Sequence, residues 1–441
     1  MVLHMTLGTA QPMIRLDVAP LRAPMDAEIT VRILNASPGG QVTVTARSID
    51  AAGQEWQSAA TFIADESGTV DLRRDPPRPG SSYTGIDPMG LVWSMRPAGA
   101  PNPQAARERL APQQLLLVAQ ADGTSPATAE VSRQLVPDGL TRTEVGERGL
   151  VGVLYRPADN RPLPAVLMLG GAEGGLHEDA AALLAAHGYV VLALAYYGMP
   201  GLPQTLTDIP VEYFGTALSY LSDQAGIAAG QIAVHGVSKG GEAALLIGSI
   251  FPAIRAVVSV VGGGLVTQGI SQDVETGSLL EILRTPVANW TYQGRELPYL
   301  PNVVTPRMEA AVAAGGPVSL GWAAPDLSRA DKVAEAAIAV ERIAGPVLLI
   351  SGADDQTYGP AFQEAAAQRL AAARHPHPFR HIVHEGAGHL IAYVGYRPTT
   401  QSVFPGPGVP FQYGGTPAAD AAAGLATWRE TLRFLDEALH S

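Results

Sequence analysis

The sequence predicts an all-β domain followed by an α/β domain with a mostly parallel sheet. Apolar and polar residues alternate with a period of two through the first third of the chain, which is typical of antiparallel strands with one face in water. From about Leu140 the apolar runs become continuous and alternate with helical stretches, which is typical of parallel strands covered on both faces. This change of pattern predicts domains at residues 1–137 and 138–441.

The N-terminal domain is expected to be a β-sandwich. Residues 29–33 and 42–46 show the alternation clearly, and Pro and Gly residues separate the short segments. Residues 115–119 and 129–135 flank the pair Asp122-Gly123, which favours the turn of a β-hairpin. Short strands with such turns are typical of a sandwich.

The second domain is expected to contain buried strands connected by helices. A last helix is expected to begin after Thr416, a capping residue followed by Pro417 at the first helical position. The expected strands are 165–169, 190–195, 232–235, 256–261 and 347–351, and the expected helices include 180–187, 213–224 and 360–373.

Residues 262–342 interrupt this alternation. They separate two expected strands by about 80 residues, far more than an ordinary connection. The segment contains large aromatic residues, among them Trp290, Tyr299 and Trp322. Two interpretations are open: a loop with its own small core, or a lid-like insertion that forms the wall of a pocket for an apolar substrate.

Composition and charge exclude several classes of protein. The chain has no cysteine, which excludes disulfides, thiolate metal sites and a cysteine nucleophile. Its 29 Lys and Arg against 41 Asp and Glu give a net charge of −12, and no basic run is present, so nucleic acid is not an expected partner. Residues 1–12 lack the features of a signal peptide, and the apolar runs are too short to span a membrane. We expect a cytoplasmic protein without a membrane partner, as a monomer or a homodimer.

A serine in a glycine-rich turn is the first candidate for chemistry. Gly236-Val237-Ser238-Lys239-Gly240 has the G-x-S-x-G pattern of a nucleophile elbow. The pattern alone is weak in a chain with 48 glycines, but here an expected strand precedes it and a helical stretch, 241–250, follows. This context favours a nucleophilic Ser238 over a structural turn, and it indicates an α/β hydrolase.

A serine nucleophile needs a base and a carboxylate that orients the base. In α/β hydrolases the carboxylate and then the histidine follow the serine along the chain. Asp354 and Asp355 come directly after the strand 347–351, so either carboxylate would lie at the same edge of the sheet as the elbow. His389 follows another short strand and three small residues, and it is the expected base. The histidines at 375, 377, 381 and 384 are interpreted as structural or solvated, because two precede Pro and two lie within the strand.

An oxyanion hole requires two backbone N–H groups. Lys239, directly after the nucleophile, is expected to supply one of them. The other is expected from Gly171 or Ala172, in the glycine-rich loop 170–175, whose alternative interpretation is a plain flexible turn. The loop lacks the spacing of a dinucleotide-binding fingerprint, and the chain has no P-loop and no helical His pair, so neither a cofactor nor a metal is expected.

Several motifs together resemble the acyl-CoA thioesterase / bile acid-CoA:amino acid N-acyltransferase family, in its bacterial branch. They cover nearly all of the chain in the family's order, at residues 83–95, 170–178, 192–197, 234–242, 345–355 and 386–389. The resemblance implies an immunoglobulin-like N-terminal domain and an α/β-hydrolase catalytic domain. It also implies a catalytic triad of Ser238, Asp355 and His389, since the family's Gly-x-x-Asp register from Gly352 selects Asp355 over Asp354.

Within that family the nucleophile separates two activities. The amino acid transferases use Cys and the thioesterases use Ser, so Ser238 implies hydrolysis of an acyl thioester, in the first place acyl-CoA, to a free acid and CoA. Two alternatives keep the same site: a carboxylesterase, lactonase or peptidase-like hydrolase, and an acyltransferase to an amine or alcohol acceptor. A binding protein with an inert hydrolase domain is the fourth hypothesis. The Lys239 side chain is expected to be a solvated charge, with contact to a CoA phosphate as the alternative.

Overall fold

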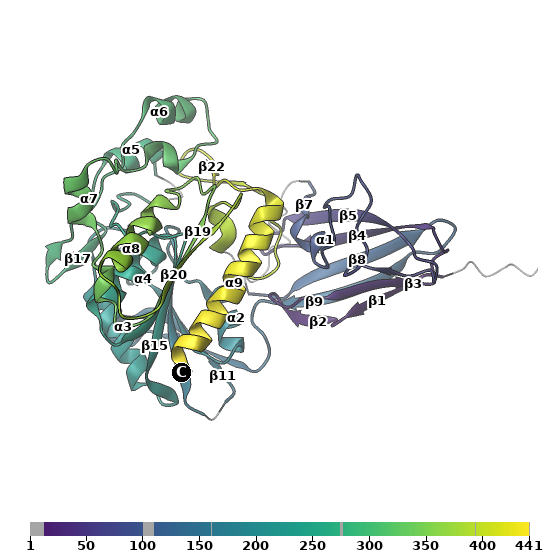
Figure 1. Ribbon diagram of the computed structural model, residues 1–441, viewed down its shortest axis with the longest axis horizontal. Helices are drawn as coiled ribbons and strands as arrows, with labels where there is room; N and C mark the ends of the chain where they lie inside the picture. The colour runs from purple at the N-terminus through teal and green to yellow at the C-terminus, as the bar shows by residue number, and fades with distance from the viewer. Residues whose placement is uncertain (1–12, 100–109, 160, 274–276, 393, 441) are drawn as a thin grey trace, which may run out of the picture. The chain divides into compact units, whose positions relative to one another are not determined.

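The computed structural model describes residues 13–99, 110–159, 161–273, 277–392 and 394–440. The prediction that residues 1–12 contain no signal peptide therefore concerns residues outside the described part. The chain divides into two compact units (Figure 1). The first unit ends at Leu135 and also includes Tyr396–Thr400, and the second unit comprises the rest. Within the described ranges, no helix is both long and apolar enough to cross a membrane.

The N-terminal unit consists of two sheets with a common hydrophobic core, drawn in purple and blue in Figure 1. The predicted alternation is confirmed in the long central strands, where every second side chain is buried. The predicted hairpin is also confirmed, since β8 and β9 pair antiparallel. One sheet has the order β1 (Arg15–Ala19), β3 (Thr30–Leu34), β6 (Val70–Asp71), and the other β2 (Arg22–Pro24), β9 (Ala127–Gln134), β8 (Gln113–Ala121), β4 (Gln41–Ile49), β5 (Glu55–Ile63), β7 (Arg96–Pro97).

The motif at residues 83–95 is part of the core of this unit. Asp87 accepts hydrogen bonds from the backbone N–H of Met89 (2.8 Å) and from the indole N–H of Trp93 (2.7 Å), which fixes the turn into the short helix α1 (Gly90–Trp93). A Cβ on Gly90 would lie 2.3 Å from the ring of Tyr83, so the ring packs directly on the backbone. The motif therefore has a structural explanation and contains no catalytic set.

A fully buried arginine holds the distant segment Tyr396–Thr400 in the N-terminal unit. The guanidinium of Arg133 donates to the carbonyl oxygens of Tyr396 and Met25, both at 2.6 Å. Burial, together with the positive charge of Arg397, lowers the pKa of Arg133 to about 9. Thr399 adds a backbone hydrogen bond to the carbonyl of Trp93 (3.0 Å).

The second unit is built on an eight-stranded sheet with helices on both faces (Figure 1). β11 pairs antiparallel with both of its neighbours, β10 and β13, and the strands from β13 to β20 pair parallel with one another. The exchange of β12 and β13 in the strand order, together with the serine turn that follows β15, establishes the predicted α/β-hydrolase fold. The order is β10 (Leu140–Val145), β11 (Val151–Pro157), β13 (Val190–Ala195), β12 (Leu163–Leu169), β15 (Ile227–Val237), β16 (Ile254–Val260), β19 (Val347–Gly352), β20 (Phe379–His384).

The helices of this unit also follow the predictions within one or two residues. Thr416 caps the last helix by accepting a hydrogen bond from the N–H of Ala419 (3.3 Å), and Pro417 occupies the first turn. Helix α4 is buried along most of its length, in agreement with its Gly- and Ala-rich sequence. The helices are α2 (Glu178–Ala186), α3 (Glu212–Asp223), α4 (Lys239–Ile250), α8 (Ala361–Ala372) and α9 (Pro417–Leu439).

The predicted insertion lies between β16 and β19 and has a small hydrophobic core of its own. Leu279, Leu283, Met308 and Val318 form this core together with Val409 from a later segment. The insertion thus has a small core, as the first interpretation expects, and the second, a pocket wall for an apolar substrate, stays a prediction. The insertion contains α5 (Leu279–Arg284), β17 (Trp290–Tyr292), β18 (Arg295–Glu296), α6 (Pro306–Ala313), α7 (Ala330–Ala336) and the short helices Leu320–Ala323 and Val340–Arg342, and β17 pairs with β14 (Ile209–Pro210).

Candidate active site

Ser238 lies in a strained turn between β15 and α4. Its backbone has φ 54° and ψ −119°, a conformation that residues with a Cβ rarely adopt. The turn is possible because backbone packs on backbone: a Cβ on Gly236 would lie 1.9 Å from the carbonyl oxygen of Gly240, and a Cβ on Gly240 would lie 2.3 Å from that of Gly170. The Ser238 N–H donates to the carbonyl of Val260 (2.9 Å), which anchors the turn to the neighbouring strand. This is the geometry that a nucleophile elbow requires.

Ser238, His389 and Asp355 form a continuous chain of hydrogen bonds. Ser238 Oγ lies 3.0 Å from His389 Nε2, and His389 Nδ1 lies 2.7 Å from Asp355 Oδ2. The side chains of His389 and Asp355 are only 11% and 5% exposed, so the histidine–carboxylate pair is shielded from water. Burial by itself would raise the pKa of Asp355, but the charge and hydrogen bond of His389 and two hydrogen bonds from Thr357 outweigh it and lower that pKa.

The structure distinguishes between the two adjacent aspartates. Asp354 Oδ2 accepts a hydrogen bond from the N–H of Gly415 (3.0 Å), whereas Asp355 reaches His389. Thr357 is a further member of the site that sequence reasoning missed. Its N–H and Oγ1 donate to Asp355 Oδ1 at 2.8 and 2.6 Å, and its Oγ1 also lies 2.9 Å from His389 Nδ1. A Thr two residues after an Asp carries no signal of its own in a sequence.

Three contacts position His389. Its N–H donates to the carbonyl of Tyr413 (2.9 Å), and the two rings stack with centroids 5.7 Å apart. The preceding residue, Gly388, donates its N–H to Asp420 Oδ1 on α9 (2.7 Å). Burial, and then the charges of Asp354 and Asp355, raise the pKa of Asp420 to about 6. The other histidines near the end of β20 have other partners: His381 contacts Ser351 (3.0 Å), and His384 contacts Thr427 (3.4 Å).

The glycine-rich loop lies beside the serine. A Cβ on Gly171 would be 3.2 Å from Ser238 Cβ, so the backbone of this loop passes directly over the nucleophile. The N–H of Gly171 donates to Glu173 Oε1 (3.3 Å), and the carbonyl of Ala172 accepts a hydrogen bond from Tyr197. Lys239 is the first residue of α4, where backbone N–H groups have no intrahelical acceptor. Lys239 thus follows Ser238 in the chain and Gly171 lies beside it in space, and the oxyanion role of these residues and of Ala172 stays a prediction.

The expectation that the Lys239 side chain is solvated is wrong. The side chain is 7% exposed, and its Nζ donates to Glu242 Oε2 (3.3 Å), to Thr267 and to the carbonyl of Gln268 (3.0 Å). Burial lowers the pKa of Lys239, and the neighbouring Glu242 partly offsets this. The side chain points into the protein, so it is not placed to meet a phosphate of a ligand.

Glu242, one turn further along α4, is the centre of a buried polar network. Its carboxylate accepts hydrogen bonds from the N–H and Oγ1 of Thr267 (3.2 and 2.8 Å), from Asn289 Nδ2 (2.7 Å) and from Trp290 Nε1 (2.9 Å), besides the ion pair with Lys239. Thr267, Asn289 and Trp290 all belong to the insertion. The nucleophile elbow and the insertion are therefore held together through one carboxylate.

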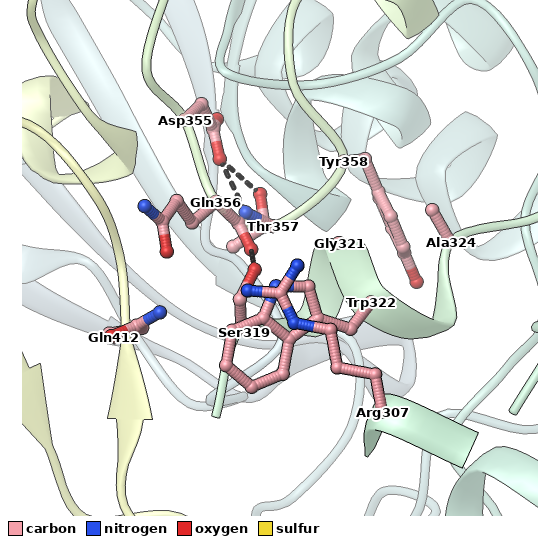
Figure 2. Close-up of a pocket in the computed structure, with 10 residues that line it drawn as sticks. All are labelled: Arg307, Ser319, Gly321, Trp322, Ala324, Asp355, Gln356, Thr357, Tyr358 and Gln412. Atoms are coloured by element: carbon pink, nitrogen blue, oxygen red, sulfur yellow. Dashed lines mark hydrogen bonds between the residues drawn. The ribbon is translucent and has the colours of Figure 1, made fainter. Parts of the chain in front are cut away.

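A cavity of about 410 Å³ lies on the carboxylate side of the triad (Figure 2). Asp355 and Thr357 form part of one wall, and Arg307 and Trp322 of the insertion lie across from them. In the part of the chain that the structure describes, no group of three or more His, Asp or Glu side chains is arranged to hold a metal ion.

Comparison with known proteins gives matches over most of the chain. The model of the BAAT / acyl-CoA thioester hydrolase C-terminal region matches residues 209–441, and that of the acyl-CoA thioester hydrolase/BAAT N-terminal region matches residues 26–147. Acyl-coenzyme A amino acid N-acyltransferase 1 of Mus musculus is 29% identical over 96% of this chain and 97% of its own. Acyl-coenzyme A thioesterase 1 of Homo sapiens is 29% identical over 95% of both chains.

Solved structures are less similar. The alpha/beta hydrolase GrgF from a Penicillium species matches 69% of this chain and 100% of its own at 16% identity with a TM-score of 0.40, which is too low to support an argument. The family models carry the assignment, because the C-terminal model alone covers more than half of the 441 residues. The chain is an enzyme, and it belongs to the acyl-CoA thioester hydrolase/BAAT family.

Proposed function

We propose that this enzyme is a serine hydrolase that cleaves acyl-CoA into a free acid and CoA. The observation that carries the proposal is the hydrogen-bonded chain from Ser238 Oγ through His389 to Asp355, which begins at a strained elbow. The substrate class rests on the family and on relatives named acyl-coenzyme A thioesterases, of which the human protein covers 95% of this chain.

In the first half of the reaction, Ser238 Oγ attacks the thioester carbonyl while His389 Nε2 takes the hydroxyl proton. Asp355 accepts a hydrogen bond from His389 Nδ1, which fixes the ring's tautomer and stabilises the imidazolium. The N–H of Lys239 and an N–H of Gly171 or Ala172 stabilise the oxyanion. The carbon–sulfur bond then breaks, and His389 gives the proton to the departing sulfur. CoA therefore leaves as the thiol.

In the second half, His389 takes a proton from water, and the resulting hydroxide attacks the acyl group on Ser238. Collapse of the second tetrahedral intermediate releases the acid, and the proton returns to Ser238 Oγ. Transfer of the acyl group to an amine is the second candidate function, since the mouse relative named an N-acyltransferase covers as much of this chain as the thioesterases do. The two candidates share the acyl-enzyme and differ only in the acceptor that resolves it.

The test measures thiol release from acyl-CoAs of short to long chain length by wild type and by Ser238→Ala. We expect rapid release by wild type and a loss of about a thousandfold or more in kcat for the variant. Ser249→Ala is the matched control, because it removes a hydroxyl from the same helix with no contact to His389. The absence of release from every acyl-CoA would overturn the proposal, and an acylated amine formed in preference to the free acid would favour the transferase.

A further inference from the structure

The cavity beside Asp355 has polar walls and a single cation. Arg307 and Trp322 come from the insertion, Gln356 and Tyr358 from the segment after β19, and Gln412 from β22 (Phe411–Gln412) (Figure 2). A volume of about 410 Å³ is large enough for a sizeable part of a small-molecule ligand. An acyl chain is a poor match for these walls, because it would desolvate amides and a guanidinium without bonding to them.

The guanidinium of Arg307 is placed to bind an anion. It lies over the ring of Trp322, 4.0 Å from the ring centroid, and among the described residues no carboxylate lies within ion-pair distance of it. Two other arginines of the insertion are paired, Arg284 with Glu309 and Arg329 with Asp331 (3.8 Å), whereas Arg295 and Arg342 have no ion pair among the described residues. The nearest carboxylate in the cavity wall, Asp355, is 5% exposed, and His389 and Thr357 occupy its oxygens.

Several neutral side chains of the cavity offer hydrogen bonds. Gln356 Oε1 is buried and has no hydrogen-bond partner among the described residues, so a donor on a ligand would satisfy it after a small rotation of the side chain. The Gln356 side chain extends towards Gln412 in Figure 2, and the Tyr358 side chain borders the cavity on the other side. The cavity thus combines a guanidinium, a flat aromatic ring, amide groups and a phenol.

We propose that this cavity binds the nucleotide end of CoA, with Arg307 holding a phosphate and the Arg307–Trp322 pair forming a platform for the base. The inference rests on the proposed function, since it assigns a further part of the same substrate. Guanidinium groups bind phosphate bidentately, and planar Arg and Trp side chains stack on nucleobases. In a chain with net charge −12, a polyanionic substrate needs a local cation of this kind at its binding site.

The experiment compares an acyl-CoA with the matching acyl-pantetheine, which has the same thioester but no nucleotide. We expect Arg307→Ala to raise the KM for acyl-CoA about tenfold relative to the KM for acyl-pantetheine, with little change in the ratio of the two kcat values. Trp322→Leu is expected to shift the KM ratio in the same direction. Arg329→Ala is the matched control, because it removes the same charge from the same insertion at a paired arginine.

The inference would be overturned if Arg307→Ala leaves the ratio of the KM for acyl-CoA to the KM for acyl-pantetheine unchanged. This holds whether the variant affects both substrates equally or neither. Calorimetric titration with CoA itself, on Ser238→Ala with and without Arg307→Ala, tests the same contact without turnover. Weaker CoA binding in the double variant supports the inference even if no acyl-CoA is hydrolysed, and equal binding contradicts it. Failure of the inference and failure of the proposed function therefore give different results.

Discussion

Asp354 and Asp355 differ by one position, and their side chains have different partners. Asp355 contacts His389, whereas Asp354 caps the N–H of Gly415. We expect Asp355→Asn to lower kcat for thioester hydrolysis about a thousandfold, because the amide no longer stabilises the imidazolium, while Asp354→Asn lowers it less than about tenfold. Steady-state kinetics of the two variants test this expectation, and equal losses would contradict the assignment of Asp355.

Asp420 predicts a pH dependence of stability. Its folded-state pKa of about 6 lies above the ordinary value of a carboxyl, because burial favours the protonated form. The protonated carboxyl therefore stabilises the fold at low pH, and this stabilisation is lost as the pH rises through 6. Asp420→Asn cannot titrate but can still accept the Gly388 N–H. We expect the stability of the variant relative to wild type to rise by about 1 kcal/mol between about pH 4 and pH 7, after allowance for solvent screening. Urea unfolding at both pH values measures the free energy of unfolding of the variant and of wild type. The same difference between the two proteins at both pH values would contradict the raised pKa of Asp420.

The sequence was informative about residues whose role follows from a local pattern. Ser238 was predicted from its glycines and His389 from its position after a strand. The strand position left Asp354 and Asp355 open, and the family resemblance selected Asp355. Thr357 and Glu242 were not predicted, because their roles depend on partners that only the folded chain brings near. The prediction for the Lys239 side chain was wrong for the same reason: a lysine in a turn is usually solvated, but here the insertion covers it.

The ion pair between Lys239 and Glu242 lies within helix α4, and residues of the insertion donate hydrogen bonds to its carboxylate, so the pair is expected to stabilise both elements. Glu242→Gln would leave Lys239 as a buried cation without its counter-charge, which typically costs about 3 to 5 kcal/mol. We expect that loss in denaturant unfolding. We also expect faster hydrogen exchange at the backbone N–H of Thr267 and the indole N–H of Trp290, which both donate to the carboxylate.

A double variant separates the charge from the packing. Lys239→Met with Glu242→Leu removes both charges together, and we expect it to be more stable than Glu242→Gln alone. The backbone N–H of Lys239 is retained in each variant, so the comparison concerns the side chains only. If Glu242→Gln is as stable as wild type, the ion pair contributes nothing to the folded state.

At the scale of elements, periodicity predicted four strands and most helices of the sheet-based core within one or two residues. The strand β15 begins five residues before its predicted start at 232, and β10 and β11 were not predicted. Continuous apolar runs marked β12, β13, β16 and β19, because strands of a parallel sheet are buried on both faces. The interior of the insertion was not predicted. Its short elements depend on a small core shared with Val409 and on the Glu242 network, and neither leaves a periodic pattern.

For the whole molecule, the segment Tyr396–Thr400 matters more than its length suggests. It belongs to the N-terminal unit, although about 260 residues separate it from that unit's last strand. A fragment of residues 1–137 lacks Tyr396, so the buried guanidinium of Arg133 loses one of its two carbonyl partners. We expect that fragment to gain about 2 kcal/mol of stability when a peptide of residues 394–402 saturates it.

Thermal unfolding of the fragment with and without the peptide measures this gain. The same experiment with Arg133→Lys is the control, because an ammonium cannot bridge the two carbonyls as a guanidinium does. A peptide that stabilises the Lys variant equally would contradict the role of Arg133. The membership of this segment in the N-terminal unit was not predicted. The change of pattern near residue 137 marks where the strands change type, and it carries no information about a short segment that returns from far along the chain.

The contacts at the elbow set a limit on variation in this chain. At positions 236 and 240 even a methyl group would enter the space of a neighbouring carbonyl oxygen, and these neighbours are main-chain atoms that cannot swing aside. By contrast, a Cβ at Gly146, whose φ is −122°, would meet nothing within 4 Å. In a saturation library screened for folded protein, positions 236 and 240 should return glycine alone. A change of substrate therefore has to be made in the cavity walls, with the turn that presents the serine left untouched.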